Sequence, residues 1–336
     1  TMHSIDAASR ITVRANFWGF LEALKVSDIV TVARVTTGAL DGQKMPYPSS
    51  AAPGTVVDVN LLGGTESSIT VATDYADALT QLINQDVQVV AVMDTDVEAP
   101  KALKVHCDNA ALAGKERNGY AGATASQTLA NLFDNYIAKV NSRHVAIAGQ
   151  QITITDPLTG VAKDLDPPWL GVLGAAAQCG RNVGIPLTYK RLGILGTKQD
   201  SGWVIGTSDD EVIEKSIFAI TKDVIGFKFL RSVTSYATDA NVVFSEISAN
   251  ESMNYSIRNL RDQLIVKIGD PATISPERFK SVVIATLRIQ KEDGFIKDFK
   301  EESVKITQTG DKYRVDYDVA PVLPLNFVTV YAPAYV

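Results

Sequence analysis

Two long helical segments followed by short alternating ones dominate the C-terminal part of the chain. Ser245–Gly269 and Ser275–Asp293 are each predicted to form one long helix. The segments that follow are predicted to be strands: Ser303–Gln308, Tyr313–Val319 and Phe327–Tyr331. This two-helix, three-strand unit contains no pattern typical of catalysis. It therefore favours packing and pairing between chains.

The final segment, Pro324–Val336, is apolar and carries almost no charge. A free terminal strand of this kind can add to the edge of another sheet, because its backbone N–H and C=O groups are available for pairing. We therefore expect this segment to add as a strand to a sheet of a neighbouring chain, which we call strand lending, and we expect the chain to be part of an assembly.

The size and charge of the chain exclude several classes of protein. The 336 residues predict two domains or one large α/β domain, with 46% hydrophobic and 21% charged residues as in ordinary globular proteins. A net charge of −6 argues against a nucleic-acid binder. The two cysteines cannot form a disulfide framework or a four-cysteine zinc site. No apolar run reaches the roughly 20 residues that span a bilayer, so we expect no membrane insertion.

Helices and strands alternate through the first half of the chain, which predicts a mostly parallel sheet with right-handed crossovers. The expected elements are helix Asp74–Asn84, strand Val87–Met93, helix Glu98–Ala113, strand Tyr120–Thr124, helix Ser126–Val140 and strand Val145–Ala148. A small-residue helix, Trp169–Gln178, and two further strands, Ile213–Ile220 and Phe227–Tyr236, are expected after them. Asp209–Glu211 is expected to be a solvated turn.

The motifs of several enzyme classes are missing or incomplete. Gly114 precedes a lysine but lacks the spacing of a phosphate-binding loop, and we expect it to cap a helix. His106 and Cys107 are neighbours on a helix, where side chains point about 100° apart and rarely bind one metal. His144 is interpreted as structural or interfacial. No catalytic residue, cofactor site or metal site is predicted.

Asp94 and Asp96 occupy the most enzyme-like position, at the carboxyl end of a predicted parallel strand. The favoured interpretation is that Asp94 or Asp96 forms a turn and caps the next helix.

The order of features from residue 74 onward resembles that of the contractile tail sheath proteins of bacteriophages. The features that carry the resemblance are the turn Asp156–Gly160 after the strand Arg143–Ala148, the helix start Asp166–Ala176, the strand Phe229–Tyr236, the helical segments Arg258–Leu264 and Ser275–Gly294, and the closing segment Pro324–Val328. Pro167 and Pro168 set the start of the helix, and the small residues after them permit close helix packing. The linking N-terminal arm of the family is not visible. Because the chain begins at Thr1 and elements are expected already at Asn16–Leu24 and Ile29–Val35, we expect a fragment without its natural N-terminal part.

The resemblance implies a structural subunit that assembles with itself, in six-fold discs, into a helical tube around a tail tube. It implies contraction that drives the tube through the host envelope, assembly in the host bacterial cytoplasm, and a place in the virion tail. The expected partners are further copies of the chain, the tail tube protein, and baseplate and tail terminator proteins. The assembly residues implied are Leu325, Asn326, Phe327 and Val328 in the terminal strand and Lys267, Arg278, Lys280 and Lys291 on the surface that faces the tube.

The predicted fold class is α/β, or α+β overall, with a mixed sheet flanked by helices and a C-terminal domain of two helices and antiparallel strands. The expected domains are a partial N-terminal segment (1–65), an α/β core (66–220) and a C-terminal α+β domain (221–336). Two alternatives remain open. One is a nucleotide- or sugar-binding α/β enzyme that uses the strand ends near Asp94 and Thr124, and the other is the sheath of a bacterial contractile injection apparatus. The missing phosphate loop favours a sheath over the enzyme.

Overall fold

The chain divides into two compact units, Thr1–Ile69 and Thr70–Val336. The computed structural model describes residues 3–5, 10–13, 59–60, 71–156, 160–239, 241–265, 275–310 and 312–324. The described residues of the first unit form an antiparallel sheet in the order β1 (His3–Ile5), β2 (Arg10–Val13), β3 (Val59–Asn60). The elements expected at Asn16–Leu24 and Ile29–Val35 lie outside the described residues.

The second unit is built on a parallel sheet of three strands, β4 (Val89–Ala91), β5 (Asn118–Gly122) and β6 (Val145–Ala148), in chain order. The helices that precede these strands are α2 (Val71–Gln81), α3 (Glu98–Leu112), and a segment of α4 (Leu129–Leu132), a π-helical turn (Phe133–Ile137) and α5 (Ala138–Val140). The expected alternation and the parallel pairing are confirmed.

Successive residues of β5 enter two different hydrophobic cores, because side chains alternate across a strand. Ala121 packs in one core with Leu103 of α3, and Tyr120 packs in the other with Leu170 of α6 (Pro167–Cys179). The sheet is therefore covered on both faces, as its nearly continuous apolar strands predicted.

Glycines let α6 approach β5 closely. A Cβ on Gly171 would lie 2.9 Å from the carbonyl oxygen of Ala121, and one on Gly174 would lie 2.8 Å from ring atoms of Phe218 and Tyr120. The small residues after Pro167 and Pro168 thus have the packing role expected of them.

Two small antiparallel sheets lie beside the parallel one. Their orders are β10-β7-β8 and β11-β12-β9. The strands are β7 (Gln151–Thr155), β8 (Ala162–Leu165), β9 (Arg191–Leu192), β10 (Gly196–Lys198), β11 (Ile220–Asp223) and β12 (Gly226–Phe229). Phe218 extends the parallel sheet by an isolated bridge to Ala148. The β7–β8 hairpin was not expected from the sequence.

The strand expected at Ile213–Ile220 is wrong over its first part. Asp209–Glu214 forms a short helix, α7, whose first turn holds three acidic residues, and acidic side chains stabilise the positive end of a helix. The turn expected at Asp209–Glu211 is thus the start of this helix. The strand expected at Phe227–Tyr236 ends at Phe229.

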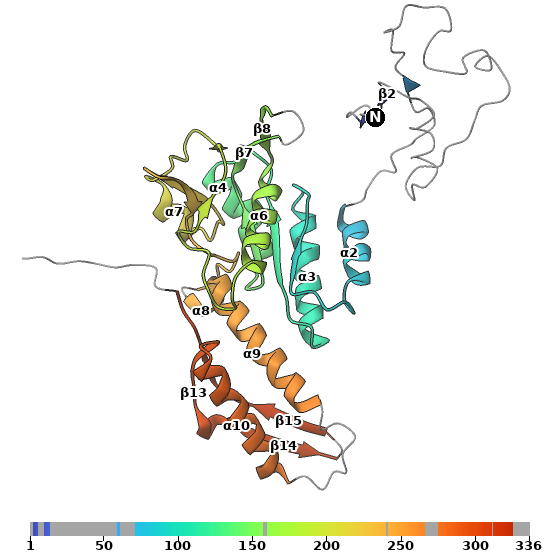
Figure 1. Cartoon of the computed structure of the whole chain (residues 1–336), viewed down its shortest axis with the longest axis vertical. Coiled ribbons are helices and arrows are strands. Elements are labelled where there is room, and N and C mark those ends of the chain that lie inside the picture. The colour runs from blue at the N-terminus through green and yellow to red at the C-terminus, as the bar shows by residue number, and fades with distance from the viewer. Residues whose placement is uncertain are drawn as a thin grey trace, which may run out of the picture. The chain divides into compact units, whose positions relative to one another are not determined.

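The remaining elements form a group that we call the C-terminal lobe, joined to the α/β part by one long helix (Figure 1). The joining helix is α9 (Ile247–Ile265), which follows the short α8 (Val242–Ser245). The elements of the lobe are α10 (Pro276–Glu292), β13 (Ile296–Phe299), β14 (Lys305–Thr309), β15 (Lys312–Asp316) and β16 (Val319–Pro321). A small core of Leu260, Val283, Leu287, Ile296 and Val304 holds the lobe together. The two predicted long helices are confirmed, and the strand expected at Phe327–Tyr331 lies outside the described residues.

Candidate assembly surfaces

The enzyme alternative would place a ligand at the carboxyl edge of the parallel sheet. The two aspartates at this edge instead form hydrogen bonds with backbone groups of the protein. Asp94 Oδ1 accepts from the backbone N–H of Asp96 at 2.9 Å, and Asp96 Oδ1 accepts from that of Glu98 at 2.9 Å. The interpretation of these two aspartates as turn residues is therefore confirmed. Asp96 lies one residue before Val97, the N-cap position of α3, and bonds the N–H of the first helical residue.

A tyrosine from the π-helical turn fills the space beside them. The hydroxyl of Tyr136 donates to the carbonyl oxygen of Thr95 at 2.6 Å and lies 2.7 Å from Oγ1 of Thr124. The backbone N–H of Thr124 donates to the same hydroxyl at 3.1 Å. Tyr136 thus joins the loops after β4 and β5, and the strand ends near Asp94 and Thr124 are held by structural contacts.

His106 belongs to a buried arginine site. Its Nε2 lies 3.1 Å from Nη1 of Arg117, and burial together with the Arg117 charge lowers the pKa of His106. The guanidinium of Arg117 donates to the carbonyl oxygens of Leu82, Ile83, Gln85 and Lys115 at 3.0–3.3 Å. Burial raises the pKa of the neighbouring Cys107 thiol to about 12. Arg117 therefore ties the end of α2 to the sheet. Among the described residues, no cluster of three side chains could bind a metal.

The long helix α9 is the joint between the α/β part and the C-terminal lobe, and polar side chains line it on two opposite sides. On the side of the sheet, the amides of Asn250 and Asn254 donate to the side-chain oxygen of Asn118. On the same side, Arg261 makes two hydrogen bonds with Glu116, of 2.8 and 3.0 Å. At about 100° per residue, these three residues of α9 share one face of the helix.

The opposite face of α9 contacts the lobe. Ser252 donates to the carbonyl oxygen of Phe295, and Ser256 donates to Gln290 at 2.6 Å. Gln290 in turn donates to Asn259 at 2.8 Å. We call the two faces together the polar joint. Its contacts are directional hydrogen bonds between buried and part-buried groups, which fix the register of α9. Ile247 and Leu260 add apolar contacts toward the two ends of the helix.

His144 lies inside the polar joint and is almost completely buried. Its Nδ1 is 3.0 Å from the Asn250 amide, and its Nε2 accepts from Arg143 Nε at 3.1 Å. Burial, and then the charge of Arg143, lower the pKa of His144 to about 4. The ring is therefore neutral at pH 7, and the expectation of a structural role agrees with its position.

This pKa predicts how stability depends on pH. The folded pKa lies below the unfolded value of about 6.5, so the unfolded state binds more protons between these values. The free energy of unfolding is therefore expected to fall as the pH drops from 6.5 to 4, by up to about 3 kcal/mol from this ring. Urea unfolding across this range measures the slope, which His144→Gln should largely remove. An equal slope in the variant would contradict this account. His106→Gln is the comparison variant: the pKa of His106 is also lowered, so this change should reduce the slope but leave the contribution of His144 in place.

The lysines and arginine expected to face a tube do not form one patch. Arg278 and Lys280 of α10 lie roughly 200° apart around the helix, whereas Lys280 and Lys291 share a face at about 20°. Lys291 makes an exposed ion pair of 2.8 Å with Asp298. Lys267 lies outside the described residues. The described part of this expected surface is thus Lys280 with Lys291, and Arg278 is separate from it.

The strands of the lobe leave sheet edges that are not paired within the described residues. β13 pairs only with β16, and β14 pairs only with β15, in two separate two-stranded sheets. Two-stranded sheets are marginal alone and can accept a further strand. The expected donor residues Leu325, Asn326, Phe327 and Val328 lie outside the described residues.

Sequence reasoning missed the polar joint and an exposed apolar hairpin tip at Val224 and Ile225. Serines and asparagines on a long helix usually indicate a solvated face, so no signal marked Asn250 or Ser256 as buried. A polar face on each side of a helix between two predicted domains is the signal that could have found the joint.

Comparison with known proteins gives matches among solved structures. Neither models of protein families nor curated proteins match the sequence. Among the described residues, no helix has the length and hydropathy to cross a bilayer.

The sheath tail protein of Desulfitobacterium hafniense is similar with a TM-score of 0.61 and 14% identity, over 81% of this chain and 62% of that one. The sheath tail protein of Listeria innocua is similar with a TM-score of 0.60 and 14% identity, over 82% of this chain and 62% of that one. The helical sheath of the anti-feeding prophage in its contracted state is similar with a TM-score of 0.58 and 17% identity, over 80% of this chain and 76% of that one. The chain thus spans 62% of the length of the two sheath tail proteins. The resemblance found in the sequence is confirmed at the level of the fold: this chain has the fold of the contractile sheath proteins.

Proposed function

We propose that the chain is a structural subunit of a contractile sheath, which assembles with itself into a helical tube around an inner tube and shortens to drive that tube through an envelope. The observation that carries the proposal is the fold, which is shared with a helical sheath in its contracted state over 80% of the chain. The hydrogen bonds that fill the carboxyl edge of the parallel sheet also favour a structural role over the enzyme alternative.

The geometry of the C-terminal lobe supports this proposal. A subunit that rearranges within an intact polymer needs contacts that survive movement between neighbours. Strand pairing provides such contacts through main-chain hydrogen bonds, and the edges of β13–β16 and β14–β15 are suited to receive strands. The proposed donor is the segment Pro324–Val336 of another copy.

The proposed partners follow from the same role. They are further copies in six-fold discs, the tube protein inside, and baseplate and terminator proteins at the two ends. Assembly in the host cytoplasm and a final place in the tail belong to the same proposal. A phage tail and a bacterial contractile injection apparatus both fit, because the similar solved structures are sheath tail proteins and the sheath of an extracellular contractile injection system. The neighbouring genes distinguish them, since capsid genes accompany only a phage.

The surface of α10 provides the test of the tube-facing assignment. The double variant Lys280→Glu, Lys291→Glu reverses two charges on one face and breaks only the exposed ion pair with Asp298. Exposed pairs contribute little to stability because solvent screens them, so the subunit should stay folded. Co-sedimentation with the tube protein is expected to drop about ten-fold or more.

Arg278→Glu is the matched control, because it reverses one charge on another face of the same helix. Equal loss in both variants would contradict the assignment of the Lys280–Lys291 face. Unchanged co-sedimentation in the double variant would show that the Lys280–Lys291 face does not contact the tube.

A further inference from the structure

We infer that the hairpin tip Val224–Ile225 of one copy docks into the hollow between α2 and α3 of a second copy, so that one end of each α/β part binds the opposite end of the next. This inference rests on the proposed function, since it names one self-assembly contact of the sheath. The contact differs from strand lending by Pro324–Val336, because both surfaces lie within the described residues of the second unit.

The hairpin tip is apolar and exposed. Val224 is fully exposed and Ile225 is 77% exposed, at the turn between β11 and β12. Two adjacent aliphatic side chains in water are unfavourable for an isolated chain and mark a contact surface when they gather at a protruding turn. Tyr189, beside β12, adds a half-exposed ring to the same region.

The tip is also held rigid. Asp223 Oδ1 accepts from the backbone N–H groups of Ile225 and Gly226 at 2.9 and 3.1 Å. Arg191 binds both carboxylate oxygens of Asp223, at 2.6 and 2.8 Å. A tip fixed before docking loses little conformational entropy on binding, which favours association.

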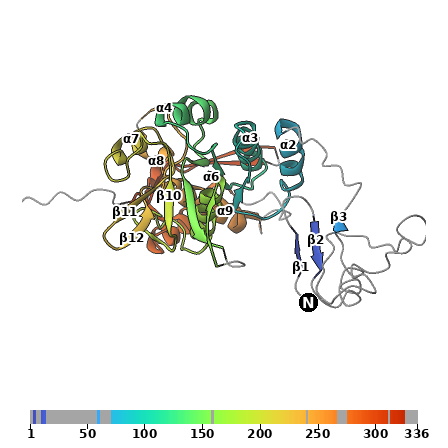
Figure 2. The ribbon, with the colours of Figure 1, turned by 90° about the horizontal axis from the view of Figure 1, so that it is seen from above.

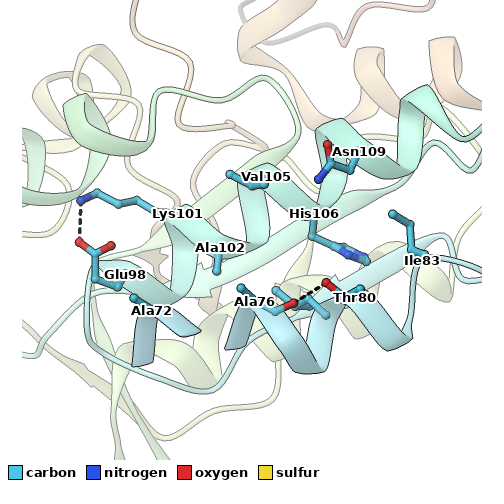
Figure 3. Close-up of a pocket in the computed structure, with 11 residues that line it drawn as sticks. Ala72, Ala76, Thr80, Ile83, Glu98, Lys101, Ala102, Val105, His106 and Asn109 are labelled. Carbon is cyan, nitrogen blue, oxygen red and sulfur yellow. Dashed lines mark hydrogen bonds and ion pairs between the residues drawn. The ribbon is translucent and has the colours of Figure 1, made fainter. Parts of the chain in front are cut away.

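The hollow has the size and lining to receive the tip. It has a volume of about 260 Å³ and lies between α2 and α3, with Ala72, Ala76, Ala102 and Val105 among its lining residues (Figure 3). The small alanines leave the space open, and Val105 is 56% exposed at its wall. A cavity of about 150 Å³ holds a benzene-sized group, so this hollow can receive two aliphatic side chains.

The charges around the two surfaces are complementary. The hairpin and its neighbour β9 carry four cations and one carboxylate, Lys190, Arg191, Lys222, Lys228 and Asp223. The segments that line the hollow, residues 71–83 and 98–109, carry four carboxylates and two cations: Asp74, Asp77, Glu98, Asp108, Lys101 and Lys104. A positive surface facing a negative one steers encounter and fixes the docking orientation.

The positions of the two surfaces decide what the contact builds. Figure 2 shows the β11–β12 hairpin and α2 at opposite ends of the α/β part. A contact between two different surfaces leaves each bound pair with one free tip and one free hollow, so it continues from copy to copy. A repeated contact of this kind gives a closed ring or an open helix, depending on the rotation between copies. Either arrangement is compatible with a tube of stacked discs.

Cross-linking of the full chain tests the contact, in a Cys179→Ser background that removes the exposed native thiol. Val224→Cys and Ala76→Cys proteins, mixed and oxidised, are expected to form a disulfide-linked heterodimer. Val161→Cys is the control partner, because Val161 is 64% exposed at a different hairpin. No heterodimer with Ala76→Cys, or an equal yield with Val161→Cys, would overturn the inference. So would protection of Ala76→Cys from thiol reagents in the monomer, because the hollow is then covered by its own chain.

Complementary variants provide a second test that does not depend on disulfides. Val224→Asp with Ile225→Asp removes the tip, and Ala76→Leu with Ala102→Leu fills the hollow. Each is expected to weaken association about 100-fold alone, because two buried aliphatic side chains are lost from the contact or excluded from it. Their mixture should form a 1:1 complex, in which the intact tip occupies the intact hollow.

A mixture that stays monomeric, or variants that polymerise like the wild type, would overturn the tip-to-hollow contact. The second result would leave the sheath proposal standing, since polymers would still form. A wild-type chain that never associates would instead count against the sheath proposal itself.

Discussion

Replacing Gly122 by alanine is expected to lower the free energy of unfolding by about 4 kcal/mol or more, or to prevent folding. A Cβ at this position would lie 2.1 Å from the backbone nitrogen of Pro168 and 2.4 Å from the carbonyl carbon of Pro167. These are backbone atoms at the start of α6, so no side-chain rotation can relieve the clash. The helix must move away from β5 and open the core around Tyr120. Urea unfolding followed by far-UV circular dichroism measures the loss.

Gly193→Ala is the matched control. A Cβ there meets no atom within 4 Å, and Gly193 does not have a positive φ angle. We expect it to change the free energy of unfolding by no more than about 0.5 kcal/mol. If Gly122→Ala were as stable as Gly193→Ala, the close packing of α6 on the parallel sheet would be wrong.

Deleting Pro324–Val336 is expected to leave a folded, soluble subunit that no longer forms sheath. The described core of the C-terminal lobe is built from Leu260, Val283, Leu287, Ile296 and Val304, which all precede this segment, and we expect them to stay packed after the deletion. Loss of a whole strand removes several main-chain hydrogen bonds for each contact, which should abolish polymerisation in the micromolar range. Sedimentation velocity measures the polymer, and circular dichroism checks the fold.

A chain in which Pro324–Val336 is replaced by a Gly-Ser sequence of equal length is the control for length. It should fail in the same way, because such a sequence is a flexible coil and a poor strand. Normal polymerisation of either folded variant would refute strand lending from this end of the chain.

The sequence predicted those elements whose local signals and packing agree. α10 begins one residue after Ser275, whose side chain accepts from the backbone N–H of Arg278, and Pro276 occupies the first turn. Gly114 follows α3 with φ of +77°, as a helix cap requires. The parallel strands were found because burial on both faces makes them continuously apolar.

The errors arose where tertiary contacts decide the outcome. The segment Ile213–Ile220 is rich in β-branched residues, but the acidic start of α7 and a turn at Ser216 with φ of +56° override that preference. The helix expected at Asp74–Asn84 begins earlier, at Val71, and Asp74 lies in its first turn.

The candidate site was harder to predict than the fold. The family resemblance and the positive charge together placed Arg278 with Lys280 on one surface, and only helical geometry separates them. The buried role of Asn250 depends on Asn118, which is far away in the sequence and is brought near by the parallel sheet. The domain limits 1–65, 66–220 and 221–336 stay a prediction.

Electron microscopy of this 336-residue chain, at high concentration and in several salt concentrations, tests the central claim most directly. The sheath proposal predicts hollow helical tubes. Monodisperse globules under every condition would contradict the claim.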